Sequence, residues 1–178
     1  SSTYTLHCTS YFGGRNRNPA ALAYAESPSV TKAMGKVTGL NIVGFVITPR
    51  TVGARVKLTP KQLRLWGKED EDGDEIDLTS RLANLTCDEE NSEEIHRFHP
   101  THGTGSRAHL TLGCAKNVNA VQTGHDQITL IKLESQKLAD PSFIQIDGAA
   151  IRYYGQGRAV VYLEEPVKVP ALFSGKYV

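Results

Sequence analysis

The sequence predicts an α+β protein with a mostly antiparallel sheet, because strand-like and helix-like segments follow one another without the regular alternation of a parallel fold. The clearest strand is "LNIVGFVITP" at residues 40–49, which is rich in β-branched side chains. The clearest helix is "NVNAVQTGHDQITLIKLESQKL" at residues 117–138, where apolar residues recur at helical spacing despite Gly124. With 39% hydrophobic and 22% charged residues, the 178 residues suit one globular domain.

Three shorter helices are predicted by the way they begin. Asn18 precedes Pro19 at the start of "NPAALAYAE", and the same order of cap and proline recurs in "SPSVTKAMGK" at residues 27–36. Thr59 and Pro60 open a third helix, "TPKQLRLWG", which we expect to end at Gly67. A polar cap followed by proline at the first helical position is typical of helix starts.

The remaining strands are predicted from alternation and turns. "ARVKLT" at residues 54–59 pairs with the first strand through an "RTVG" turn, and "SRAHLTLGC" at 106–114 forms another strand. Residues 142–163 are expected to form strands around a tight "GQG" turn. "PVKVPALFSG" at 166–175 is expected to be a separate, proline-interrupted strand.

The charge is distributed unevenly along the chain. Residues 69–94 hold 12 of the 19 acidic residues and one basic residue, which leaves 19 basic and 7 acidic residues elsewhere, a balance of +12. A basic body suggests an anionic, phosphate-bearing partner, although the same charges could simply be solvated. We expect residues 68–105 to be a flexible acidic insert, with a short helix around "LTSRLANLT".

Nothing in the sequence predicts a membrane span or a disulfide framework. No stretch approaches 18 consecutive apolar residues, and no signal peptide opens the chain. The three cysteines have no framework spacing, so a reduced, intracellular protein is expected. The start without methionine indicates a domain taken from a longer chain.

Four histidines are followed two residues later by threonine, in "HCT", "HPT", "HGT" and "HLT". The pairs at His99 and His102 enclose proline and glycine beside the acidic segment, so we interpret them as loop residues. Together with His96 and Cys87 they suggest zinc ligands, but a proline-containing loop lacks the defined geometry of a zinc site. No metal site is therefore predicted.

The other two pairs fall on predicted strands. In "TYTLHCTSYF", His7 and Thr9 share one face of the strand, about 6.5–7 Å apart. His109 and Thr111 do the same in "SRAHLTLGC", with Arg107 on their face. Two half-buried histidines on an ordinary sheet are the alternative interpretation.

Such a pair suits the hydrolysis of a cyclic phosphodiester. One imidazole can accept a proton from water while the other donates a proton to the departing ribose oxygen. Hydroxyls of the two threonines, with Arg107, can donate hydrogen bonds to the phosphate oxygens. The scheme needs neither a metal ion nor another cofactor.

Longer stretches of the sequence identify a family more specifically than the His-any-Thr motif does. "LHCTSYF", "ITPRTVGARVKLTPKQLRLW", "GSRAHLTLGCAKNVNAVQTG" and "ALFSGKYV" resemble the catalytic domain of the 2′,3′-cyclic-nucleotide 3′-phosphodiesterase (CNPase) family, within the two-histidine phosphoesterase superfamily. The resemblance covers nearly the whole chain and implies one catalytic domain over residues 1–178. It implies two pseudo-symmetric lobes, each a small antiparallel sheet with outer helices, whose His-any-Thr strands face a central cleft. The long acidic insert departs from the mammalian pattern.

The resemblance also implies the reaction and the catalytic residues. Nucleoside 2′,3′-cyclic phosphates would be hydrolysed to 2′-phosphates without a metal ion. His109 would activate water and His7 would protonate the leaving 3′ oxygen, although the near-symmetry leaves the opposite assignment open. Thr9 and Thr111 would bind the phosphate.

Four further residues match substrate-binding positions of the family. Phe12 would stack on a nucleobase, with core packing as the alternative, and stacking of this kind contributes about 1–3 kcal/mol. Arg107 would lie near the phosphate, with an ordinary surface arginine as the alternative. Val121 and Gly124 would line the rim. Tyr11 and Trp66 are expected to serve packing instead.

The expected partners are 2′,3′-cyclic nucleotides or RNA ends that carry a cyclic phosphate. An alternative function is a module that binds single-stranded RNA or cytoskeletal proteins and has weak catalysis. We expect a cytoplasmic monomer that does not insert into membranes. The family implies a longer parent with a polynucleotide-kinase-like domain and C-terminal lipidation at the cytoplasmic face of membranes, and neither signature occurs in this sequence.

Overall fold

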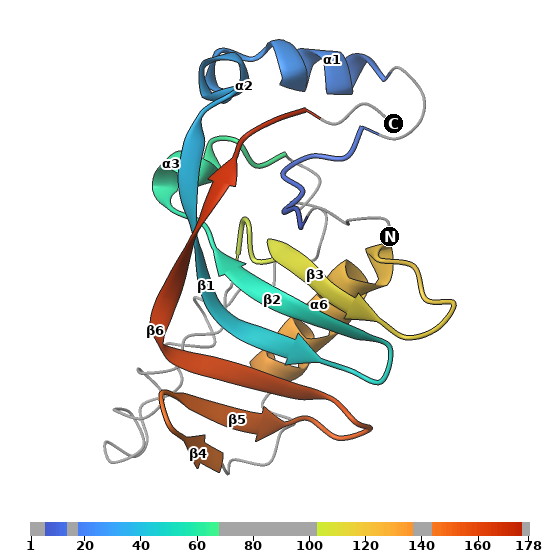
Figure 1. Cartoon of the computed structure of the whole chain (residues 1–178). Coiled ribbons are helices and arrows are strands. Elements are labelled where there is room, and N and C mark those ends of the chain that lie inside the picture. The colour runs from blue at the N-terminus through green and yellow to red at the C-terminus, as the bar shows by residue number, and fades with distance from the viewer. Residues whose placement is uncertain (1–5, 14–17, 68–102, 137–143, 176–178) are drawn as a thin grey trace.

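A six-stranded antiparallel sheet forms the centre of the protein (Figure 1). The computed structural model describes residues 6–13, 18–67, 103–136 and 144–175. The strands lie in the order β3-β2-β1-β6-β5-β4, and the α+β class with an antiparallel sheet is confirmed. The strands are β1 Val37–Ile47, β2 Thr51–Lys57, β3 His109–Cys114, β4 Ile144–Ile146, β5 Ala149–Tyr153 and β6 Ala159–Leu172, and the helices are α1 Pro19–Glu26, α2 Pro28–Ala33, α3 Pro60–Leu63 and α6 Val121–Ser135.

The short helices begin where their caps predict. The Asn18 side chain accepts a hydrogen bond from the backbone N–H of Ala20 ahead of α1, and Thr59 forms a capping box with Gln62 at α3. Both helices have proline in the first turn. The prediction that the third helix continues to Gly67 is wrong, because α3 ends at Leu63. Beyond it, the backbone N–H groups of Leu65 and Trp66 donate to carbonyls three residues back, as in isolated turns.

Two strand boundaries differ from the prediction. β2 already begins at Thr51, since the backbone N–H of Thr48 donates to the Thr51 carbonyl and closes a tighter turn than "RTVG". The last segment is not a separate strand but the second half of β6, with Pro166 and Pro170 inside it. Prolines are tolerated there because β5 pairs with β6 only as far as Leu163, so beyond that point one edge of β6 is open and needs no N–H.

The strand predicted at residues 3–12 is not found, because the described part, residues 6–12, forms neither strand nor helix. Side chains and isolated hydrogen bonds hold this segment in place of a backbone ladder. The ring of Tyr11 stacks on that of Tyr24 with 4.4 Å between centroids, as expected for a packing residue. The N–H of Gly67 donates to the Ser10 carbonyl at 2.8 Å. The acidic insert, its short helix and the histidines at 96, 99 and 102 lie outside the described residues.

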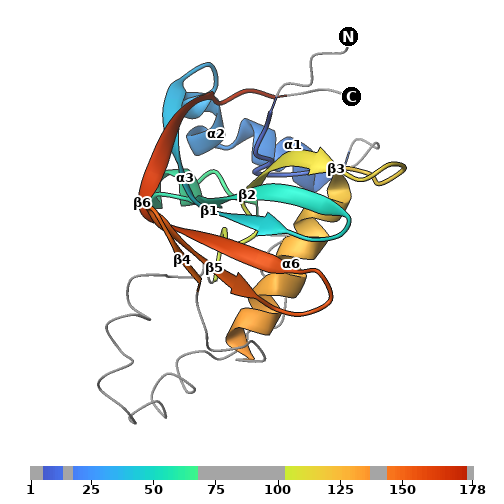
Figure 2. The same ribbon diagram turned by 60° about the horizontal axis from the view of Figure 1, so that its bottom comes forward.

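Alternating residues of the sheet contribute to two hydrophobic clusters. On the face covered by α6, Val46 packs with Leu130 and Tyr162 (Figure 2). On the other face, Val56 and Leu110 pack in a second cluster, and α1 and α2 lie together near the start of β1 and the end of β6 (Figure 1). The same cluster includes Trp66, as predicted for a packing residue, and Cys8 from the N-terminal segment.

A buried ion pair fixes the C-terminal half of α6 to the sheet. Arg55 on β2 donates to Glu134 with 2.8 Å between Nη1 and Oε1, and their side chains are 1% and 2% exposed. The hydroxyl of Tyr162 also donates to Glu134. The hydroxyl of Tyr154 lies 2.7 Å from the hydroxyl of Tyr162. Burial lowers the pKa of Arg55, but the adjacent carboxylate more than offsets this and raises the pKa overall.

Replacing this carboxylate should destabilise the whole domain. Glu134→Gln leaves the Arg55 charge buried without a counter-charge, and we expect the free energy of unfolding to fall by about 3–5 kcal/mol. Urea denaturation measures the change, with the exposed Glu164→Gln as a control that should stay within about 0.5 kcal/mol. An equal effect of the two substitutions would show that the pair does not anchor α6.

Candidate active site

His109 and Thr111 lie on β3, which is an edge strand, and their side chains face α6. His109 is paired with Arg55 of β2, whose side chain reaches α6 from the same face of the sheet. Leu110, which lies between His109 and Thr111, packs in the cluster on the opposite face. Both residues are half-buried. His109 and Thr111 thus occupy alternate positions of β3, on a face that α6 covers in part.

The imidazole of His109 is held in one orientation. Its Nδ1 lies 2.7 Å from the carbonyl oxygen of Arg107. Because a carbonyl only accepts hydrogen bonds, the neutral ring carries its proton on Nδ1 and keeps the lone pair on Nε2. Gly124 of α6 lies against the ring, where a Cβ atom would come within 3.2 Å of Cε1. The absence of a side chain at residue 124 therefore leaves room for the imidazole of His109.

The surroundings keep His109 in its neutral form. Burial lowers the pKa of His109 below its ordinary value of 6.5. The hydrogen bond to the Arg107 carbonyl acts in the opposite direction and raises the pKa without overcoming burial. The positive charges of His7 and Arg107 lower it further. At neutral pH, Nε2 of His109 is therefore available as a proton acceptor.

The N-terminal segment lies beside β3. His7 and His109, which are far apart in the sequence, are therefore close together in the fold. The backbone N–H of His109 donates to the sulfur of Cys8, and His7 is close enough for its charge to act on His109. Burial raises the pKa of Cys8 to about 11, so its thiol stays neutral. His7 and Thr9, on either side of Cys8, are exposed.

The hydroxyl of Thr111 is directed at α6. Its Oγ1 lies 3.1 Å from Oγ1 of Thr123 and 3.4 Å from the carbonyl oxygen of Ala120. Thr123 is fully buried, and Gly53 of β2 makes room for it, because a Cβ there would come within 2.6 Å of its methyl carbon. Donation to a phosphate would require Thr111 to turn its O–H away from the helix.

The other predicted substrate-binding residues differ in exposure. Phe12 and Val121 are each 67% exposed, which excludes core packing as the reason for Phe12. Val121 borders a surface pocket of about 490 Å³ that His125 also lines. Arg107 is half-buried, and its charge lies close enough to act on His109.

Sequence reasoning missed the buried polar residues of α6. Asp126 accepts hydrogen bonds from the hydroxyls of Thr48 and Thr51, both at 2.8 Å, and from the side chains of Gln122 and Arg50. Burial alone would raise its pKa, but these four donors lower it, so Asp126 is a carboxylate that ties the β1–β2 turn to the helix. The signal was present as polar residues at the core-facing spacing of α6: Thr123, Asp126, Gln127 and Glu134.

Two kinds of feature are absent from the described residues. No three His, Cys, Asp or Glu side chains among them are grouped so that they could bind a metal ion. None of the helices in the described ranges is long and apolar enough to cross a bilayer.

Comparison with known proteins decides the family. A family model described as "2',3'-cyclic nucleotide 3'-phosphodiesterase (CNP or CNPase)" matches residues 2–178. The chain belongs to the CNPase family. Proteins named 2′,3′-cyclic-nucleotide 3′-phosphodiesterase from Pongo abelii and Mus musculus are 33% and 30% identical over 172 residues, or 97% of this CNPase domain. The match spans 35% and 36% of their lengths, so the chain corresponds to about a third of these relatives.

Gly124→Ala should move the His109 ring without weakening the CNPase domain. Alanine favours a helix interior over glycine by about 1 kcal/mol, so the free energy of unfolding should stay equal or rise. The added methyl presses on Cε1 of His109, and the ring resonances in ¹H–¹³C NMR spectra should shift. Gly113→Ala on β3, where a Cβ meets nothing within 4 Å, is the matched control. Unshifted His109 resonances would contradict the tight contact.

His109 should titrate at a lower pH than an ordinary histidine does. We expect an NMR titration to place the pKa of His109 below 6.5, and Arg107→Leu to raise it, because the variant removes a positive charge and keeps the backbone carbonyl. Since the folded pKa lies below the unfolded value, this histidine lowers the free energy of unfolding as the pH falls below about 6.5. A wild-type pKa above 6.5 would contradict the assignment of burial as the dominant cause.

Proposed function

We propose that this CNPase domain hydrolyses nucleoside 2′,3′-cyclic phosphates to nucleoside 2′-phosphates without a metal ion. The observation that supports the proposal best is the His109 imidazole, which is kept neutral and oriented through Nδ1 with a second histidine beside it. Relatives over 97% of the chain are named as phosphodiesterases of this specificity. The catalytic domain would extend over residues 1–178, with the acidic insert as part of it.

His109 is the general base in this proposal. Its Nε2 takes a proton from water while the water oxygen forms a bond to phosphorus. A base must be unprotonated at the working pH, and the lowered pKa of His109 meets this requirement. The opposite assignment, with His109 as acid, would need a protonated ring in surroundings that disfavour its charge.

His7 is the general acid. As the bond between phosphorus and the 3′ oxygen breaks, His7 donates its proton to that oxygen, and the phosphate remains on the 2′ oxygen. One proton enters the protein at His109 and one leaves from His7, so exchange with solvent restores both rings. The exposure of His7 allows this exchange.

Hydrogen-bond donors around the phosphate complete the site. Thr9 and Thr111 would donate to the oxygens that carry negative charge in the transition state, and Arg107 would add a positive charge beside them. Thr9 is exposed and Thr111 half-buried, so both hydroxyls can be reached. Removing one donor of this type raises the activation barrier by about 2.7–4 kcal/mol in other enzymes.

The nucleoside would lie against the exposed apolar side chains near the site. Phe12 would stack on the base, and Val121 with Gly124 would form the rim at the start of α6. Stacking tolerates any base, which suits a general substrate class of cyclic nucleotides and RNA ends.

We also propose that the site lies in a cleft between two lobes. The register shift between Ile42 and Gly44 divides the pairing of β1 with β6 into two parts, one on each side of residues 163–166. The half near α1 and α2 would form the lobe that carries His7, and the half covered by α6 would form the lobe of His109. A monomeric domain of a cytoplasmic parent, anchored by C-terminal lipidation, completes the proposal.

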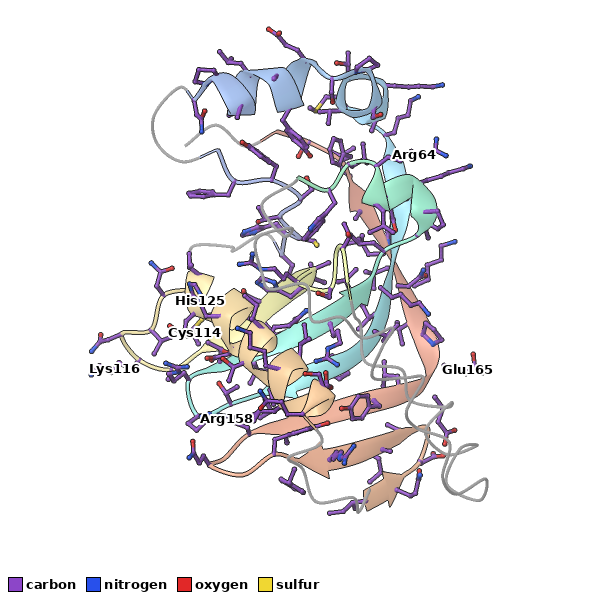
Figure 3. The ribbon with its side chains drawn as sticks, turned by 180° about the vertical axis from the view of Figure 1, so that it is seen from behind. Arg64, Cys114, Lys116, His125, Arg158 and Glu165 are labelled. Atoms are coloured by element: carbon purple, nitrogen blue, oxygen red, sulfur yellow. The ribbon has the colours of Figure 1, made fainter. Side chains whose placement is uncertain are left out.

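Product analysis tests the reaction. Phosphorus NMR of adenosine 2′,3′-cyclic phosphate with the purified domain should show the 2′-phosphate alone, at a rate unchanged by EDTA. His7→Ala and His109→Ala should each lower kcat by about 10²–10⁴-fold with an unchanged circular dichroism spectrum. Arg64→Ala is the control, since Arg64 is exposed at the end of α3 and does not line the pocket that borders Val121 (Figure 3).

The outcomes separate the candidate functions. The 3′-phosphate as product, or full activity in either histidine variant, would contradict the proposed roles. No turnover, together with single-stranded RNA binding that weakens steeply with salt and survives both substitutions, would support the RNA-binding module instead. Loss of activity with EDTA would contradict the metal-free mechanism.

A further inference from the structure

We propose that Gln127 is a positioning residue that fixes the tautomer and orientation of His109; this inference rests on the proposed function. Gln127 lies in the second turn of α6 and is completely buried. The hydrogen bonds of its side-chain amide go to backbone carbonyls rather than to the imidazole. It acts on the backbone that holds the ring.

The side-chain amide of Gln127 binds the two carbonyls on either side of Arg107. Its Nε2 lies 2.6 Å from the carbonyl oxygen of Ser106 and 3.2 Å from that of Ala108. Between them, the Arg107 carbonyl accepts the Nδ1 proton of His109 at 2.7 Å. Three consecutive carbonyls are thereby fixed by side chains, and the middle one determines which nitrogen of His109 carries the proton.

The segment before β3 depends on such support. It is a succession of turns in which Gly103 and Gly105 have positive φ angles of 70° and 78°. Its local hydrogen bonds run from the N–H of Ser106 to Gly103 and from that of Ala108 to Gly105. These bonds fix backbone N–H groups, whereas the carbonyls of Ser106 and Ala108 both accept hydrogen bonds from α6.

The polarity of Gln127 indicates a role beyond packing. The carbonyl of Ala108 already accepts a bond from the N–H of Val56, so the second bond from Gln127 is not needed to satisfy it. Oε1 of Gln127 is buried and accepts no hydrogen bond from the described residues, which is an unfavourable state for an amide. An apolar side chain of equal length would avoid that cost, but it would remove the hydrogen bonds from α6 to the carbonyls on either side of Arg107.

Two neighbours of Gln127 on α6 contact the same stretch of chain, from Ser106 to Thr111. Thr123 contacts the hydroxyl of Thr111, Gly124 lies against the ring of His109, and Gln127 follows one turn later on the same side of α6. Successive turns of α6 therefore contact successive parts of the segment from Ser106 to Thr111.

Gln127→Met tests the proposal, because methionine keeps the length and volume and removes the donors. Long-range ¹H–¹⁵N NMR should show one neutral tautomer of His109 in the wild type, with the proton on Nδ1. In the variant the Nε2–H tautomer should appear, and kcat should fall by about 10-fold, the lower end of the effect of removing the groups that orient metal-bound histidines. Gln127→Asn, whose amide is one methylene shorter, should give an intermediate tautomer ratio and decides the matter if Gln127→Met does not fold.

Gln62→Met is the matched control. Gln62 is also a buried glutamine whose amide donates to a backbone carbonyl, that of Gly39 at 2.8 Å, but it belongs to α3. It should leave the His109 tautomer and kcat unchanged after correction for folded fraction. An unchanged tautomer in both Gln127 variants would overturn the proposal, even if cyclic phosphodiesterase activity is present. A wild type that shows no turnover but has a tautomer dependent on Gln127 would overturn the proposed function alone.

Discussion

The attachment of α6 to the sheet is the constraint on which the rest of the site depends. At its C-terminal half, Glu134 forms a buried ion pair with Arg55. At its N-terminal half, Asp126 accepts hydrogen bonds from the turn between β1 and β2. The residues that contact the segment of His109 and Thr111 are Thr123, Gly124 and Gln127, which lie immediately around Asp126. The helix is thus fixed to the sheet in both halves, and one of these attachments lies within the part that faces the candidate site.

Buried charges fix the register of a helix more strictly than apolar contacts do. Sliding α6 by one residue would turn its side chains by about 100°, which follows from 3.6 residues per turn. Leucine and valine can adapt to such a shift, whereas a carboxylate removed from its arginine or hydroxyl partners would remain buried and unpaired. The ion pair and the Asp126 cluster therefore allow one register, the one in which Gly124 meets the imidazole.

The elements that local sequence patterns predict are those whose structure is decided locally. Caps and prolines set the starts of α1 and α3, and β-branched residues set β1. The errors occur where a partner elsewhere in the chain decides. β6 continues through Pro166 because its neighbour has already ended, and residues 6–12 form no strand although their pattern alternates. Alternation does not reveal whether a pairing strand exists.

The same distinction applies to the candidate site. His109 and Thr111 follow from the alternation of one strand, and Gly124 came only from the family resemblance. Gln127, Thr123 and Asp126 were overlooked because each acts on atoms far away in sequence, and no local rule says what a buried polar side chain will bind. Their presence on the core-facing side of α6, where apolar residues are the rule, was the available signal.

The fold also makes the two histidines unequal, and the inequality suits the proposed division of roles. His109 lies on a strand, is half-buried, and has its ring fixed by the Arg107 carbonyl and Gly124. A base benefits from this, because its lone pair must point at the attacking water before reaction begins. His7 is exposed on a segment held at β3 by a neutral thiol, which is a weak acceptor. An acid that must regain its proton from solvent after every turnover is better placed there than in the half-buried position of His109.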